Sequence, residues 1–183
     1  GSGQICKPCH TPHNASTVAD EKPLWNHVIS SAAYTVYTNA PTFQGGPADN
    51  PPSGSSKLCL SCHDGTVALD NFGGMNTGMV PPYVPGTTMA VFSPSHNLGT
   101  DLSNDHPVSF IYNAALAAAD LGLYNPVTQP AGAPLVGTID VAMLDGADKV
   151  QCASCHNPHD GTFFKLLRKS NTNSGLCLTC HAK

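Results

Sequence analysis

The chain of 183 residues has few charged residues and no long apolar run. Charged residues make up only 11% of it, and the net charge of −4 is spread without a run of like sign. Because there is no basic patch, electrostatics give no reason to expect nucleic acid as a partner. No apolar stretch approaches the roughly 18 residues that a membrane-spanning helix needs, so we also predict no membrane span.

Long segments with a helical or strand repeat of apolar residues are also scarce. The 17 glycines and 16 prolines interrupt the periodicity that would mark regular elements. The polypeptide by itself therefore offers little material for an ordinary hydrophobic core.

Cysteine is absent outside four copies of one short motif, Cys-x-x-Cys-His, which together use all eight cysteines. This spacing is the signal for covalent attachment of c-type haem. The two thiols add across the haem vinyl groups, and the histidine is held beneath the iron as its axial ligand. We predict one haem c at each motif, four per chain. In chain order, motifs 1 to 4 are Cys6, Cys9 and His10; Cys59, Cys62 and His63; Cys152, Cys155 and His156; and Cys177, Cys180 and His181.

Disulfides and zinc explain this pattern less well. Eight cysteines could form four disulfides in a secreted protein, but a bridge within Cys-x-x-Cys is strained and leaves the following histidine unexplained four times. Two Cys-x-x-Cys pairs could make a four-thiolate zinc site, yet such a site needs no histidine directly after each second cysteine.

Four haems would supply the missing core, because each macrocycle is a large rigid apolar plate tied to the chain. We therefore predict a mostly irregular, coil-rich multihaem cytochrome c with a few short α-helices and minimal β-structure, in which the haem stack forms the core.

The motifs belong to an internal repeat. Residues 6–14 parallel residues 152–160, and each of these segments is followed by a Leu-Cys-Leu block that opens the next motif. We predict one tetrahaem domain over residues 1–183. In it, haem-pair units of about 1–70 and 150–183 are joined by the cysteine-free segment 71–149.

Regular elements are predicted at only a few places. The clearest is a helix over residues 107–121, capped by Asn104 or Asp105 with Pro107 in its first turn. A short helix over 24–37, a strand or two over 135–143 and one or two helical turns over 161–169 are also predicted. The segments rich in proline and glycine are predicted to be loops, namely 39–56 and 71–99.

The histidine count bears on the chemistry of the irons. Nine histidines leave five beyond the four of the motifs, namely His13, His27, His96, His106 and His159. Methionine is the other usual axial ligand, but this excess favours histidine on both faces of every iron. Such irons are saturated and have no vacant position for a substrate. We therefore predict an electron carrier and not an enzyme.

His13 and His159 are the most constrained candidates. Each lies three residues after the histidine of a motif, so the connecting backbone spans at most about 10 Å. The porphyrin blocks the path to the far face of its own iron, and each can reach only a different haem packed close by. His106, beside the predicted helix cap, and His27, beside Trp25, complete the predicted distal ligands. His96, in a loop with little anchoring, is predicted to be the surplus histidine.

The residues around the ligands carry a resemblance to a known family. Residues 9–14, 23–27, 58–68 and 101–107 resemble the OmcE-type tetrahaem cytochromes, which polymerise into extracellular filaments. The resemblance implies a continuous haem stack, with a histidine near the N terminus ligating a haem of the neighbouring subunit. The matching position is His13. It also implies a head-to-tail homopolymer at the cell surface that exchanges electrons with other redox proteins or with extracellular acceptors.

Two other functions were weighed against the filament. A monomeric periplasmic electron shuttle is disfavoured by the small number of lysines and arginines, 8 in all. A multihaem oxyanion reductase would need an iron with an open face, whereas histidine is in excess. Because c-type haem is attached outside the cytoplasmic membrane and the sequence begins Gly1-Ser2-Gly3, we expect an exported protein whose signal peptide has been removed.

Overall fold

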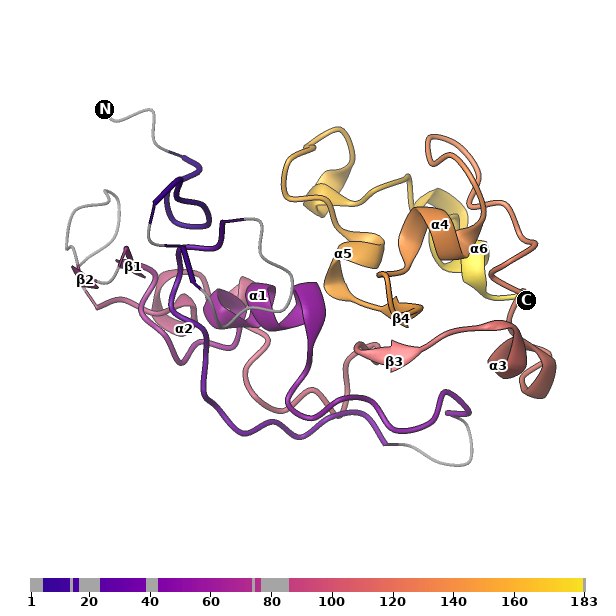
Figure 1. Ribbon diagram of the computed structural model, residues 1–183, viewed down its shortest axis with the longest axis horizontal. Helices are drawn as coiled ribbons and strands as arrows, with labels where there is room; N and C mark the ends of the chain where they lie inside the picture. Colours follow the sequence, from indigo (N-terminus) through magenta and orange to yellow (C-terminus); the bar gives the residue numbers. More distant parts are fainter. Residues whose placement is uncertain are drawn as a thin grey trace. The chain divides into compact units, whose positions relative to one another are not determined.

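The chain divides into two compact units, each holding two of the four motifs. The computed structural model describes residues 5–13, 15–16, 24–38, 43–73, 75–76 and 86–182, with backbone alone for 75–76 (Figure 1). Unit 1 consists of residues 1–36 and 50–105, and unit 2 of residues 37–49 and 106–183. The cysteine-free segment 71–149 is thus divided between the units, and the prediction of a single domain stays a prediction.

Unit 1 is built around one helix of ten residues that carries motif 2. Its elements are α1 (Gly54–His63), β1 (Asn71–Phe72), β2 (Met75–Asn76), α2 (Met89–Phe92) and the 3-10 turn η1 (Pro94–His96). Helix α1 buries Leu58 and Leu60. It ends because Asp64 closes the last turn with its N–H on the Leu60 carbonyl, 2.9 Å away. Gly65 follows with a left-handed φ of 73°, and a Cβ there would collide with the side chain of Asn97.

The prediction of a helix over residues 24–37 is wrong. The segment is extended and makes isolated bridges at Trp25, His27 and Thr35. Its backbone N–H groups donate to other segments, for example from Val28 to the carbonyl of Asn71, 2.9 Å away. Tertiary pairing therefore replaces the intrahelical bonds, in keeping with the β-branched residues that dilute the helical signal here.

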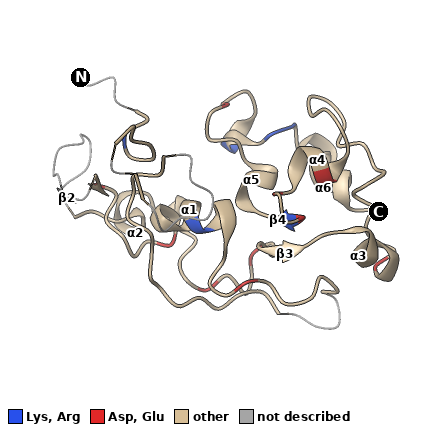
Figure 2. Cartoon of the chain, in the orientation of Figure 1, with Lys and Arg blue, Asp and Glu red and all other residues tan. Residues whose placement is uncertain are grey.

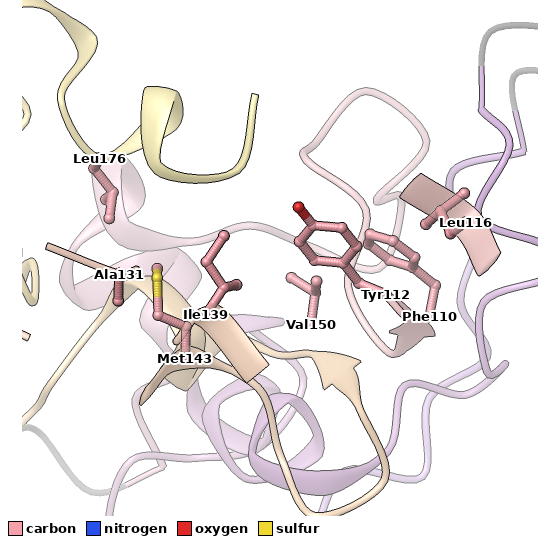
Figure 3. Packing of buried hydrophobic residues seen from close by; sticks show 8 residues of the cluster. All are labelled: Phe110, Tyr112, Leu116, Ala131, Ile139, Met143, Val150 and Leu176. Carbon is pink, nitrogen blue, oxygen red and sulfur yellow. The ribbon is translucent and has the colours of Figure 1, made fainter. Parts of the chain in front are cut away.

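In the described part of the chain, unit 2 has more elements than unit 1, and it has a buried cluster of its own. These elements are β3 (Phe110–Ile111), α3 (Ala114–Ala119), α4 (Ile139–Met143), β4 (Lys149–Val150), α5 (Cys152–Cys155), the 3-10 turns η2 (Phe164–Leu166) and η3 (Thr172–Ser174), and α6 (Cys177–Cys180). Strands β3 and β4 pair antiparallel, with Phe110 opposite Val150. Figure 3 shows the buried cluster that these elements share, made of Phe110, Tyr112, Leu116, Ala131, Ile139, Met143, Val150 and Leu176.

Three predictions in unit 2 need correction. The helix predicted over 107–121 is limited to α3, because residues 110–111 form β3. Its N-cap is Asn113, whose side-chain oxygen accepts from the Leu116 N–H at 3.0 Å, instead of Asn104 or Asp105. The strand predicted over 135–143 is wrong, since α4 occupies 139–143. Segment 161–169 contains only one 3-10 turn, η2, in which Lys165 and Leu166 have left-handed φ.

The coil-rich fold class is confirmed, with short helices and two-residue strands throughout the described chain. The part of that prediction in which haems form the core stays a prediction. Of the predicted loops, residues 39–42, 74 and 77–85 lie outside the described residues, and α1 begins within the first loop at Gly54. In the part of the chain that the structure describes, no helix has the length and apolar character to cross a membrane.

Candidate haem sites

All four motifs adopt the same helical turn. Motif 2 ends α1, motifs 3 and 4 coincide with α5 and α6, and motif 1 forms an isolated turn. In motif 1 the His10 N–H donates to the Cys6 carbonyl at 2.8 Å, and the matching bonds in motifs 3 and 4 are both 3.0 Å. A helical turn brings residues that are three and four positions apart to one face. The two thiols and the imidazole of a motif can therefore bind the same flat ligand. No disulfide joins any of the eight cysteines, all of which are described.

Burial raises the pKa of the second thiol in every motif. For Cys62 and Cys180 the pKa rises to about 12, and the second contribution comes from Cys9 and Cys155 respectively. Electrostatic coupling of this kind requires the two sulfur atoms to be near one another. In each unit, therefore, the second cysteines of the two motifs lie close together, and the two attachment points are neighbours.

Two motif histidines are oriented by backbone carbonyls from later in the chain. Nδ1 of His63 lies 2.8 Å from the carbonyl oxygen of His96, and Nδ1 of His156 lies 3.0 Å from that of Lys165. Because a carbonyl only accepts, each Nδ1 carries the proton and donates. The Nε2 lone pair is then available to an iron, and the ring orientation is fixed.

The loops that supply these carbonyls are held against their motifs by further backbone bonds. Leu98 N–H donates to the His63 carbonyl at 2.7 Å, and Arg168 N–H donates to the Cys155 carbonyl at 2.9 Å. The left-handed φ of Lys165, 60°, is part of the turn that brings its carbonyl to His156. The sequence carries no signal for either acceptor, because every residue has a carbonyl and only the fold selects which one is used.

The rings of His106 and His181 lie together in unit 2. Their centroids are 6.3 Å apart and the ring planes are at 81°. Nδ1 of His106 lies 2.9 Å from the carbonyl of Pro107, which leaves its Nε2 for another partner. Two imidazoles on opposite faces of one metal, with metal–nitrogen bonds of about 2.0–2.1 Å and ring centres about 1.1 Å farther out, would have centroids roughly 6.2–6.4 Å apart. The separation of this pair has room for one iron.

His27 is 1% exposed and has a backbone carbonyl near each ring nitrogen. Nδ1 lies 2.9 Å from the Val28 oxygen, and Nε2 lies 3.1 Å from the Ala68 oxygen. Burial lowers the pKa of His27, which favours the neutral ring with a single N–H. One of the two nitrogens therefore directs a lone pair at a carbonyl oxygen, which is an unfavourable contact.

The other three candidate ligands are exposed on turns. His13 and His159 lie directly after motifs 1 and 3, where Thr11 Oγ1 donates to the His13 carbonyl and the His159 N–H donates to Asn157 Oδ1. The ring of His96 contacts Ser93 Oγ through Nδ1 at 2.7 Å. From these positions the structure neither assigns the three histidines to an iron nor rules out that they bind one. The set of distal ligands therefore stays a prediction.

The surroundings of the motifs suit haem c. Large apolar side chains next to the attachment points are exposed, among them Ile5 (87%) before motif 1 and Phe164 (84%) in η2. Leu178, between the two cysteines of motif 4, is also exposed. A porphyrin would cover such side chains, while the thiols and imidazoles supply its bonds. The described residues contain no group of three or more His, Cys, Asp or Glu side chains arranged to hold a metal ion.

Comparison with known proteins supports this interpretation for unit 2. Residues 146–183 match the family model of the doubled CXXCH motif, and this segment contains motifs 3 and 4. No curated protein matches the chain. The doubled motif is typical of electron-transfer proteins that bind haem c covalently. The match and the shared geometry of the motifs together support a multihaem c-type cytochrome.

Proposed function

We propose that the protein conducts electrons through four covalently attached haems c, each iron bound by two histidines. We propose further that its subunits join head to tail into an extracellular filament of the OmcE type. Motifs 1 and 2 repeat the geometry of the matched pair, motifs 3 and 4, and this supports a count of four.

The observation that carries the proposal is the pair His106 and His181, whose rings have centroids 6.3 Å apart and planes at 81°. This separation suits one six-coordinate iron with a motif histidine below and a distal histidine above. An iron saturated by two imidazoles accepts and releases electrons without binding substrate. The pair therefore supports electron transfer over the reductase alternative.

The proximity of second cysteines supports haem pairs in near contact. Cys9 contributes to the raised pKa of Cys62 in unit 1, and Cys155 contributes to that of Cys180 in unit 2. Macrocycles tied to neighbouring sulfurs lie close to each other, which is the condition for fast electron hopping. In this arrangement His159 ligates the iron of motif 4 or another nearby haem, because the haem at motif 3 blocks the way to its own iron.

The filament part of the proposal concerns His13. It is exposed on the turn after motif 1, and it cannot reach the far face of its own iron. An exposed imidazole that cannot reach its own iron is suited to ligate a haem of an adjacent subunit. A contact between two different surfaces of identical subunits propagates without limit unless it closes into a ring.

The ligand assignment is tested by spectra of the oxidised and reduced protein with added carbon monoxide. We expect four haems by mass, all low-spin and none binding carbon monoxide. His106→Ala should keep four haems and open one iron, while His96→Ala should open none. If His96→Ala opens an iron and His27→Ala does not, His27 is the surplus histidine. Carbon monoxide binding at one haem of the unmodified protein would favour the reductase.

The filament is tested by electron microscopy of the purified protein and of His13→Ala. We expect filaments from the former, and from the variant soluble monomers with one iron lacking its sixth ligand. His96→Ala, also an exposed histidine of unit 1, is the matched control and should still polymerise. Monomers from the unmodified protein would favour the periplasmic shuttle. Full-length filaments from His13→Ala with all irons six-coordinate would reject ligation across subunits.

A further inference from the structure

Trp25 is the only tryptophan of the chain, and its indole N–H is buried without an acceptor. The side chain is 7% exposed, and Nε1 has no hydrogen-bond partner among the described residues. Burying an N–H group costs free energy when the group loses its hydrogen bond to water and gains no other acceptor. Such groups are rare in folded proteins. The indole is therefore placed for an acceptor that the described polypeptide does not supply.

Trp25 lies directly beside motif 1. It bridges His10 across two antiparallel segments, and its ring stands edge-on to the imidazole with centroids 6.4 Å apart. Asn26 N–H donates to the Cys9 carbonyl at 2.9 Å, which holds the two segments in register. Trp25 also packs with Leu58, the residue before motif 2, and with Cys9. Any group bound at motif 1 would therefore lie close to this indole.

The backbone carbonyls around Trp25 already have donors. The carbonyl of Trp25 accepts from Ser16 N–H at 2.7 Å, and that of Leu24 accepts from Thr11 N–H at 2.9 Å. The carbonyl of Lys7 accepts from the Asn26 side chain at 2.5 Å. The local backbone is thus satisfied, whereas the indole is not.

We propose that Trp25 Nε1–H donates a hydrogen bond to a propionate of the haem c attached at Cys6 and Cys9, which rests on the proposed function. The two propionates are the anionic acceptors of haem, and a hydrogen bond to an anion is stronger than one between neutral groups. The bond would position the first macrocycle. By drawing charge away from the propionate, it would also make that iron easier to reduce.

The direct test is ultraviolet resonance Raman spectroscopy of the holoprotein, in which the single indole gives an unambiguous N–H hydrogen-bond marker band. We expect the position of a strongly bonded indole, and a shift to that of an unbonded or water-bonded indole when Cys6→Ala and Cys9→Ala together remove the first haem. An unbonded or water-bonded position in the holoprotein, or a band unchanged by loss of the first haem, would overturn the proposal.

A second test avoids removing a haem. Trp25→Phe, or replacement of tryptophan by benzothienylalanine, which keeps the bicyclic shape but has sulfur in place of N–H, should shift the propionate bending band of one haem. The midpoint potential of that haem should fall while the others are unchanged. Unchanged potentials and bands with the sulfur analogue would reject the bond.

The haem count separates this proposal from the proposed function. Mass analysis of the peptide containing Cys6 and Cys9 shows whether the first haem is attached. A peptide without haem would contradict the proposed function and this inference together. Four attached haems with an unbonded indole would contradict this inference alone.

Discussion

Each of the two units carries two motifs, but the units differ in the buried residues that pack around them. Unit 2 has a buried apolar cluster of eight residues, including Ile139 at 0% exposure. Among the described residues of unit 1, the corresponding cluster is Trp25 and Leu58, with Cys9 and Ile29 packed against it, and the other buried apolar side chains lie outside this cluster, namely Leu60, Leu69, Phe72 and Leu102. Unit 1 instead holds its segments together through backbone bridges and buried polar groups. We therefore expect unit 2 to keep more of its structure than unit 1 when haem is absent.

The units also differ in the charges near their motifs. In unit 1, Asp64 directly follows motif 2, is 3% exposed and accepts a hydrogen bond of 2.6 Å from the Tyr34 hydroxyl. In unit 2, the ammonium of Lys169 donates to Thr179 within motif 4 and to the Ala131 carbonyl, both at 2.8 Å. Charged residues are otherwise few and dispersed over the described chain (Figure 2). A buried carboxylate favours ferric iron and an ammonium favours ferrous iron, so we expect lower potentials in unit 1.

The largest effect should come from removing one haem from each unit in turn. Cys59→Ala with Cys62→Ala should abolish amide protection over most of unit 1, because its apolar core is then incomplete. The matched change in unit 2, Cys177→Ala with Cys180→Ala, should leave β3, β4 and α4 protected. Hydrogen–deuterium exchange followed by mass spectrometry measures both. Equal loss of amide protection in the two units would show that they depend on haem to the same extent.

The next prediction tests how much the apolar cluster of unit 2 contributes to stability. Ile139→Ala should lower the free energy of unfolding by about 2–5 kcal/mol, the usual cost of truncating a fully buried large aliphatic side chain. Val141→Ala on the same helix is the control, since Val141 is 76% exposed and should change stability by less than about 0.5 kcal/mol. Denaturant unfolding of the holoprotein gives both values. If the two variants unfold alike, the haems and not the cluster stabilise unit 2.

The motif turns and the coil-rich class follow from the sequence, because both depend on local patterns. Cys-x-x-Cys-His forms a helical turn at all four of its places in this chain, and frequent glycine and proline disfavour long elements. Predictions that depend on distant partners did less well. Residues 24–37 have some helical character, but the N–H groups of Asn26, Val28 and Thr35 donate to other segments. Residues 110–111 pair with β4, and α3 begins after them with Asn113 as its N-cap.

The same distinction holds for the candidate sites. The thiols and imidazoles are identifiable from spacing alone. The carbonyls of His96 and Lys165 that orient two motif histidines, and the unpartnered indole of Trp25, became visible only in three dimensions. Backbone acceptors carry no residue signature, and a buried donor is recognised only when its surroundings are known.

A smaller effect concerns the reduction potentials. Asp64→Asn should raise the potential of the haem at motif 2 by tens of millivolts, since a charge interaction on the order of 1 kcal/mol corresponds to about 40 mV for one electron. Asp101→Asn is the control in the same unit, because Asp101 is exposed and its charge is screened by solvent. Spectroelectrochemical titration resolves the change. If Asp64→Asn leaves the potential unchanged, buried charge is not the reason for a difference in potential between the units.

The smallest effect is a dependence of the free energy of unfolding on alkaline pH, to which one tyrosine in each unit contributes. Burial, and then the hydrogen bond to Asp64, raises the pKa of Tyr34 from 10.0 to about 12. In unit 2, burial raises the pKa of Tyr112, whose hydroxyl donates to the Tyr124 carbonyl at 2.5 Å. A pKa raised by folding means that the folded state favours the neutral phenol. The stabilisation is therefore complete below about pH 10 and is lost as the pH rises through the folded pKa.

We expect the free energy of unfolding to fall between about pH 10 and pH 12, and to fall less steeply in Tyr34→Phe, because the phenyl ring has no proton to lose. The change is small because Tyr34 is only partly buried, and solvent screens its interaction with Asp64. Tyr112→Phe should flatten the curve over the same range and on to higher pH, because burial raises the pKa of Tyr112 further than that of Tyr34. Unfolding curves measured at closely spaced alkaline pH values test both variants. An identical slope in the unmodified protein and in Tyr34→Phe would show that the Tyr34–Asp64 contact does not contribute to the stability of unit 1.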